Sequence, residues 1–87
     1  MTSPSSSVQE ARRALGRRLS EIRLEVGLTK RALASSLGWH ESKCSRFESG
    51  THPPSKRDLR AWAGACGAES AAEDLISTAR GIEGAAC

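Results

Sequence analysis

The feature that most constrains the fold is the stretch 28–50, LTKRALASSLGWHESKCSRFESG, in which two short amphipathic segments flank a glycine. Thr29 can cap a first helix, because its hydroxyl can accept a backbone N–H that has no partner within the helix. Apolar residues then recur at helical spacing over 30–37. Gly38 can end this helix, because glycine adopts the left-handed conformation without steric cost. The pattern predicts one short helix followed by a tight turn.

A second short helix is predicted to begin at His40 or Glu41. Its inward residues are Cys44 and Phe47, which are three positions apart, and Gly50 closes it. Two short helices joined by a tight glycine turn form a helix-turn-helix, whose second helix enters the major groove of DNA. The segment 40–49 is therefore the predicted recognition helix.

The same stretch resembles the DNA-binding domain of the Cro and phage-repressor family, often called XRE-like. The residues that carry the resemblance are Leu28-Thr29, the small Ala34, Gly38 followed by an apolar residue, and Ser45-Arg46-Phe47-Glu48-Ser49-Gly50. The resemblance runs from about Leu15 to Gly67 and is strongest to actinobacterial members, in which such a domain opens a longer regulator. It implies an all-α fold: a five-helix, phage-repressor-like DNA-binding domain.

Three further helices are predicted around this unit. The first covers 8–26, where apolar residues three or four apart, the last of them Val26, form one stripe. A fourth helix begins after the cap Ser55, because a double proline before it enforces an extended connection. A last helix covers 70–80, and its first residue can form a capping box with Glu73.

This pattern divides the chain of 87 residues into three parts. Residues 1–7 are predicted to be a disordered tail, 8–80 the helix-turn-helix domain, and 81–87 a flexible tail that carries Cys87. No run approaches the roughly 18 apolar residues of a membrane span, and the polar start of the chain is no signal peptide. We therefore expect a cytoplasmic protein with no membrane partner.

Positive charge coincides with the helix-turn-helix. The net charge is +3, but residues 27–60 hold seven Lys or Arg against three acids, whereas the part after residue 60 is acidic. Charge alone is typical of an ordinary solvated surface. Its coincidence with the motif instead favours binding to nucleic acid.

The outward face of the predicted recognition helix carries the candidates for reading DNA bases. By resemblance these are Glu41, Ser42 and Arg46, with Lys43 alongside. Arg can donate two hydrogen bonds to guanine and Glu can accept one from cytosine, which favours a half-site containing G·C pairs. Glu41 could instead only reject wrong bases, or stabilise the N-terminus of its helix.

A second set of residues is expected to contact DNA phosphates. Lys30 stands where the resembled family commonly places a phosphate-binding glutamine, and lysine can fill that role at a helix N-terminus. His40 replaces the usual Ser or Thr cap, so the cap is weaker or the imidazole contacts the DNA backbone itself. The other candidates flank the recognition helix: Thr29, Thr51, His52, Lys56 and Arg57.

The resemblance also implies an ion pair between Arg23 and Glu48. Arg23 lies beside the apolar stripe of the first helix, and Glu48 directly follows the inward Phe47, so both are boundary residues. The alternative is two unpaired surface charges.

Catalytic and metal-binding chemistry has no support in the sequence. The three cysteines form no CxxC pair and no Cys/His cluster with zinc spacing, and Cys44 and Cys66 are predicted to be small buried hydrophobes. No nucleophile–base pair is evident. We expect neither an enzyme nor a cofactor.

Two functions remain. The first is a sequence-specific transcriptional regulator, repressor-like, that binds a roughly palindromic operator on double-stranded DNA as a homodimer. The second is a protein-interaction module, antitoxin-like or bound to a regulator partner. An apolar stripe in the last helix would serve as a dimer interface or pack on the first helix: Ala72, Leu75, Ile76 and Ala79.

Overall fold

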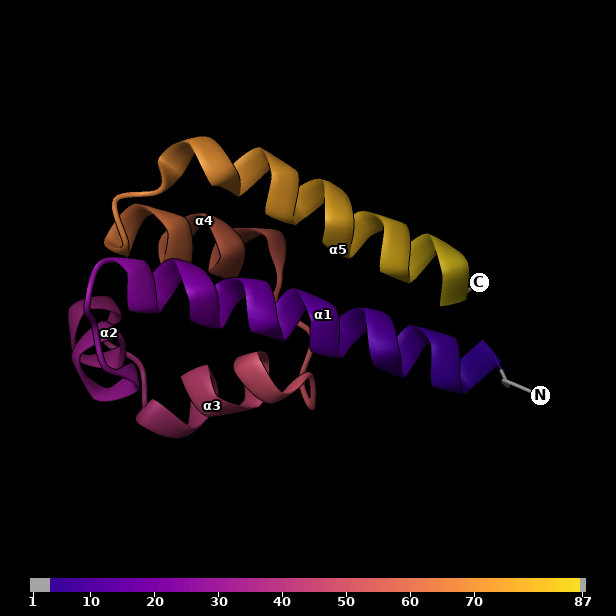
Figure 1. Cartoon of the computed structure of the whole chain (residues 1–87), viewed down its shortest axis with the longest axis horizontal. Coiled ribbons are helices and arrows are strands. Elements are labelled where there is room, and N and C mark those ends of the chain that lie inside the picture. Colours follow the sequence, from indigo (N-terminus) through magenta and orange to yellow (C-terminus); the bar gives the residue numbers. More distant parts are fainter. Residues whose placement is uncertain (1–3, 87) are drawn as a thin grey trace.

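The structure is a computed structural model that describes residues 4–86, with side chains over 8–82 (Figure 1). All regular structure in these residues is helical, which confirms the predicted all-α fold. Its elements are α1 (Pro4–Glu25), α2 (Lys30–Leu37), α3 (Glu41–Ser49), α4 (Lys56–Ala65), the 3-10 turn η1 (Glu69–Ala71) and α5 (Ala72–Ala86).

Helix α1 is the axis of the molecule. Helices α2 and α3 lie below it in Figure 1, with α3 packed on α1 and α2 packed on α3 and α4, whereas α4 and α5 lie above it. Helix α5 runs antiparallel to α1, so that the start of α1 and the end of α5 lie at the same end of the molecule. The helix-turn-helix formed by α2 and α3 therefore lies on one side of α1.

The core is built from buried side chains of all five helices. Leu19, Leu33, Leu59 and Leu75 are almost fully buried at its centre. The indole of Trp62 is buried among them, and its Nε1–H donates a hydrogen bond of 3.1 Å to the carbonyl oxygen of Leu19. That bond satisfies the one polar atom of the largest core side chain.

Two glycines allow α1 to touch the backbone around α3. A Cβ atom at Gly16 would clash with the carbonyl oxygen of Glu48 and lie 2.8 Å from that of Phe47. Gly50, at φ +80°, approaches the backbone N of Arg13, which would lie 3.0 Å from an added Cβ. A glycine inside a helix costs about 1 kcal/mol relative to alanine, and close packing is what compensates here.

The ends of α1 differ from the prediction. The helix begins at Pro4 rather than at residue 8, so that residues 4–7 of the expected disordered tail are helical. Proline suits this position, because its missing N–H and fixed φ fit the first turn of a helix. At the other end, α1 stops at Glu25, and Val26 is half exposed instead of completing the apolar stripe. Residues 1–3 of that tail lie outside the described residues.

The last helix is longer than predicted. Helix α5 continues to Ala86, through most of the segment 81–87 that the sequence predicts as a flexible tail, because Ile82 is buried against the core. Residue 87 lies outside the described part of the chain. At its start, Ser70 lies in the 3-10 turn and Glu73 pairs with Arg60 at 3.4 Å, so the predicted capping box is wrong.

The apolar stripe of α5 is used inside the molecule. Leu75 and Ile76 are 1% and 5% exposed, and Ala72 is also buried, where α5 packs on α1 and α4. Of the two roles that the sequence leaves open for this stripe, packing on the first helix is therefore the one that the structure shows. Its side chains are needed to seal a small core.

Candidate nucleic-acid interface

The turn between α2 and α3 is formed by local hydrogen bonds. The hydroxyl of Thr29 accepts the N–H of Ala32 at 3.0 Å and caps α2. At the other end Gly38 takes φ +71°, and the N–H of Trp39 donates to the carbonyl oxygen of Ala34 at 2.8 Å. These caps fix the angle at which α3 leaves the turn.

The register of α3 is the one predicted. Cys44 and Phe47 are buried, whereas Glu41, Ser42 and Arg46 are exposed on the opposite face. The residue before the helix, His40, makes no side-chain cap, so its exposed imidazole is left for other contacts.

A shallow depression lies where the start of α2 meets α3. It is lined by Lys30 from α2 and by Glu41, Ser42, Ser45 and Arg46 from α3. The structure therefore brings three of the predicted base-reading residues beside the predicted phosphate ligand Lys30. Of the five residues that line this depression, Glu41, Ser42 and Arg46 are exposed. Lys30 and Ser45 are partly buried.

A second depression lies on the other side of the same face. Ser42 and Arg46 line it too, together with His40 and His52. His52 is held in place by two contacts: its ring stacks on Phe47 at 5.9 Å between centroids, and its backbone N–H donates to the carbonyl oxygen of Arg46 at 3.3 Å. The two histidines thus frame the recognition helix near its start and beyond its end.

Lys43 lies differently from its neighbours. Its Nζ is 3.4 Å from Oδ1 of Asp58 in α4 and 4.2 Å above the ring of Trp39. Asp58 also completes a capping box with Ser55, through hydrogen bonds of 3.1 and 3.2 Å. Lys43 is therefore engaged with α4 within the protein, and it also lines the second depression with Ser42 and Arg46.

The environment of Asp58 favours its charged form. Partial burial acts to raise the pKa of this carboxyl, but the hydrogen bonds from Ser55 and the nearby Lys43 ammonium outweigh burial. The pKa of Asp58 consequently lies below its ordinary value. Its negative charge holds Lys43 and caps α4 at the same time.

The remaining phosphate candidates are spread along the edge of the domain. Thr29, Thr51 and Arg57 are exposed, and the hydroxyl of Thr51 lies 2.8 Å from that of Ser49. Lys56 lines a separate depression with Arg80 of α5. The structure does not bring Lys56 into either depression beside α3.

Arg23 and Glu48 are brought together as the resemblance implies. Arg23 Nε donates to Glu48 Oε2 at 2.7 Å, and the two side chains are 9% and 7% exposed. The guanidinium also donates to the carbonyl oxygen of Leu28 at 2.7 Å. Its hydrogen bond with Glu48 is the main reason that the pKa of Arg23 lies above its ordinary value.

Sequence reasoning missed three contacts that position this site. No residue type marks the carbonyl of Leu28 as a partner for Arg23, since every residue carries one. Asp58 has a capping signature that gives no hint of Lys43. Gly16 is indistinguishable in sequence from a weak point in a helix. Each contact depends on residues that only the fold brings together.

Two of the cysteines, Cys44 and Cys66, are buried in the core. Burial raises the pKa of the Cys44 and Cys66 thiols, which favours the unreactive protonated form. Within residues 4–86 no cluster of His, Cys, Asp and Glu has the geometry to hold a metal ion. The helices of that part of the chain are also too short or too polar to cross a membrane.

The family comparison agrees with this geometry. Residues 14–75, which are most of the chain and include all of α2, α3 and α4, match the model of a family described as a helix-turn-helix domain. No curated protein and no solved structure matches the chain.

Proposed function

Because the chain belongs to this helix-turn-helix family, we propose that it is a sequence-specific, XRE-like transcriptional regulator whose α3 enters the major groove of DNA. The observation that carries the proposal is the exposed cluster at the start of α2 and along α3. Glu41, Ser42 and Arg46 lie on one face, with Lys30 at its edge. Side chains able to read bases thus lie next to one able to bind phosphate, which supports the proposal.

Arg46 supplies the main base contact in this proposal. Its guanidinium is exposed and can donate two hydrogen bonds to O6 and N7 of a guanine. Glu41, one and a half turns earlier, accepts from the amino group of a cytosine or rejects bases that offer only acceptors there. The operator half-site is thus expected to contain G·C pairs.

Phosphate contacts surround this centre. Lys30 binds one strand from the N-terminus of α2, where unpaired N–H groups also favour an anion. His40, Thr51 and His52 lie along the depression and loop beside α3 and contact the DNA backbone from there. Thr29 and Arg57 extend this set. Lys56 lies farthest from it, because it lines a depression with Arg80.

Two copies are proposed to bind one operator. Repressors of this architecture that act as dimers place their recognition helices about 34 Å apart, one turn of DNA. The apolar stripe of α5 is buried within the chain, so a symmetric contact must use another surface. A regulator that binds the chromosome in this way acts in the cytoplasm and needs no catalytic group.

Selection from a random DNA library tests the proposal. The purified chain is expected to enrich one sequence family, roughly palindromic and containing G·C pairs, and to bind it more tightly than scrambled DNA. Arg46→Ala should change the enriched sequence, whereas the exposed Arg60→Ala on α4 is the matched control and should not. Enrichment of no sequence by the wild-type chain would contradict the proposal and favour the protein-interaction role.

A further inference from the structure

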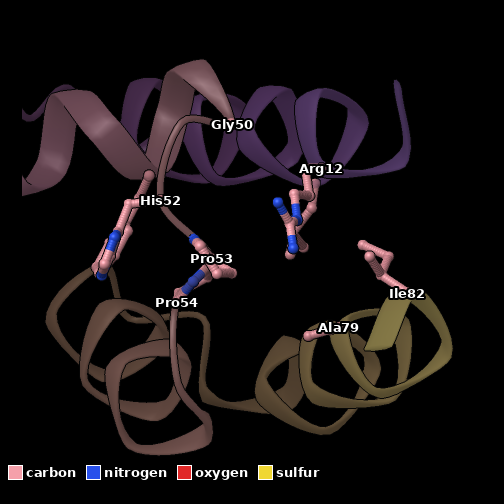
Figure 2. Close-up of a pocket in the computed structure, with 9 residues that line it drawn as sticks. Arg12, Gly50, His52, Pro53, Pro54, Ala79 and Ile82 are labelled. Carbon is pink, nitrogen blue, oxygen red and sulfur yellow. The ribbon is translucent and has the colours of Figure 1, made fainter. Parts of the chain in front are cut away.

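A pocket lies behind the recognition helix, between α1, the loop after α3 and α5 (Figure 2). Leu15 and Phe47 form its apolar floor, and both are buried in the core. Pro54, Ala79 and Ile82 form its walls. The cavity measures about 50 Å³ and is partly open to solvent.

Arg12 brings a charge into this apolar space. Figure 2 shows its side chain reaching from α1 into the gap between the 50–54 loop and α5. Its Nε atom is buried, and among the described residues it has no hydrogen-bond partner. Buried donors in proteins are nearly always paired, so this N–H requires an acceptor.

We propose that the pocket binds a small aliphatic carboxylate, held by Arg12. A carboxylate matches the fork of N–H donors on a guanidinium, and an ion pair in a partly buried site gives strong, directional hydrogen bonds. The apolar floor and walls fit a short hydrocarbon body, as in most small-molecule sites.

The size of the cavity sets the class of ligand. A single water needs roughly 10–15 Å³ of such space, so about 50 Å³ admits roughly three to five groups of that size. The four-carbon isobutyl body of isovalerate has about that size, and would lie with its methyl groups against Phe47 and Ile82 and its carboxylate at Arg12. Larger acids would have to extend through the open mouth.

The pocket is a separate site from the proposed DNA interface. His52 borders both, but the base-reading residues Glu41, Ser42 and Arg46 do not line the pocket. The proposal therefore goes beyond DNA binding and does not depend on it. Its test is direct binding, which remains informative even for a chain that selects no operator.

Titration of the complete ¹⁵N-labelled chain with isovalerate, followed by NMR, tests the site. We expect shifts of the amides that line the pocket, and no comparable shifts with the neutral isovaleramide. Arg12→Met should weaken binding at least tenfold. Ala79→Leu, which fills the cavity without removing charge, should do the same. Ser77→Leu, on an exposed position of α5, is the matched control.

The outcomes separate the proposal from its alternatives. Equal binding of acid and amide, or affinity unchanged by both Arg12→Met and Ala79→Leu, would overturn it. The chain has one carboxylate of its own directly after Ile82, Glu83. Binding that appears only in Glu83→Gln would identify this residue as the natural occupant and also overturn the proposal. Should Arg12→Met not fold, Ala79→Leu decides alone.

Discussion

Arg23 of α1 and Glu48 of α3 are joined by two hydrogen bonds, from Nε to Oε2 at 2.7 Å and from Nη2 to Oε1 at 3.1 Å. The same guanidinium holds the carbonyl of Leu28, just before α2. A single buried side chain of α1 therefore binds both the start of the helix-turn-helix and the end of its recognition helix. Arginine suits this role because its fork of donors is planar and rigid.

Removing either partner of this pair is expected to destabilise the fold strongly. The remaining charge would be buried without compensation, which costs about 3–5 kcal/mol in comparable pairs. Urea unfolding of Arg23→Ala, Glu48→Ala and the double variant measures the coupling. We expect the double variant to lose much less stability than the sum of the single ones. Additive losses below about 1 kcal/mol, as for exposed pairs, would contradict this prediction.

Arg46 and Lys30 are expected to respond differently to substitution if α3 reads DNA. Arg46→Ala should cost roughly 1–3 kcal/mol on the preferred operator and relax the preference at one base pair. Lys30→Ala should weaken binding to all sequences alike and reduce the salt slope by about one. Anisotropy titrations on matched operator variants at several salt concentrations measure both effects. An unchanged ranking of operators by Arg46→Ala would mean that another face of α3 reads the bases.

Gly16 is expected to resist substitution. Alanine is the better helix former by about 1 kcal/mol, but its Cβ would meet the backbone of Glu48, and overpacking typically costs about 1–3 kcal/mol. Gly64 is the matched control, since it also lies within a helix and an added Cβ there meets nothing within 4 Å. Thermal unfolding should show that Gly16→Ala destabilises and Gly64→Ala stabilises. Equal shifts would show that the α1–α3 contact can relax.

The Asp58 carboxylate predicts a pH dependence of stability. Its pKa is lowered in the folded protein, so the stability that it contributes is complete above the ordinary pKa, about 3.9, and is lost as the pH falls through the folded value. Asp58→Asn should therefore be less stable than wild type at pH 7, by about 0.3–1 kcal/mol, as for other acids in the first turn of a helix. The difference should shrink below pH 4. Urea unfolding across that range measures it, and a difference independent of pH would contradict the prediction.

Leu75 should behave as a core residue. Leu75→Asp would bury an unpaired charge and is expected to unfold the protein, whereas Ser77→Asp on the exposed side of α5 should leave the fold intact. Circular dichroism and mass by light scattering distinguish the cases. A folded Leu75→Asp protein with half the mass of wild type would restore the α5 dimer interface.

The parts of this fold that could be predicted are those with local causes. Gly38 and Gly50 end their helices through backbone conformations that other residues rarely adopt, and this placed α2 and α3 correctly. The inward Cys44 and Phe47 follow from helical spacing alone. The exposed base-reading candidates follow from the same register.

The parts that could not be predicted depend on distant residues. Helix α5 continues past residue 80 because Ile82 is buried in the core. The sequence also left open whether the apolar stripe of α5 packs on α1, because that depends on where α1 lies. Lys43 pairs with Asp58, fifteen positions on, while it also lines the second depression beside Arg46. The extension of α5 and the Lys43–Asp58 pair have no signature in the residues around them.

Glu48 is held at both its main chain and its side chain, the first against Gly16 and the second by Arg23. A helix fixed in this way can neither rotate about its axis nor slide along α1. The recognition face is thus preorganised: the entropy of ordering α3 is lost when the chain folds, and little of it is left to be lost when DNA binds. Adaptation to different operators would then have to come from the DNA, or from exchange of the outward side chains on an unchanged scaffold.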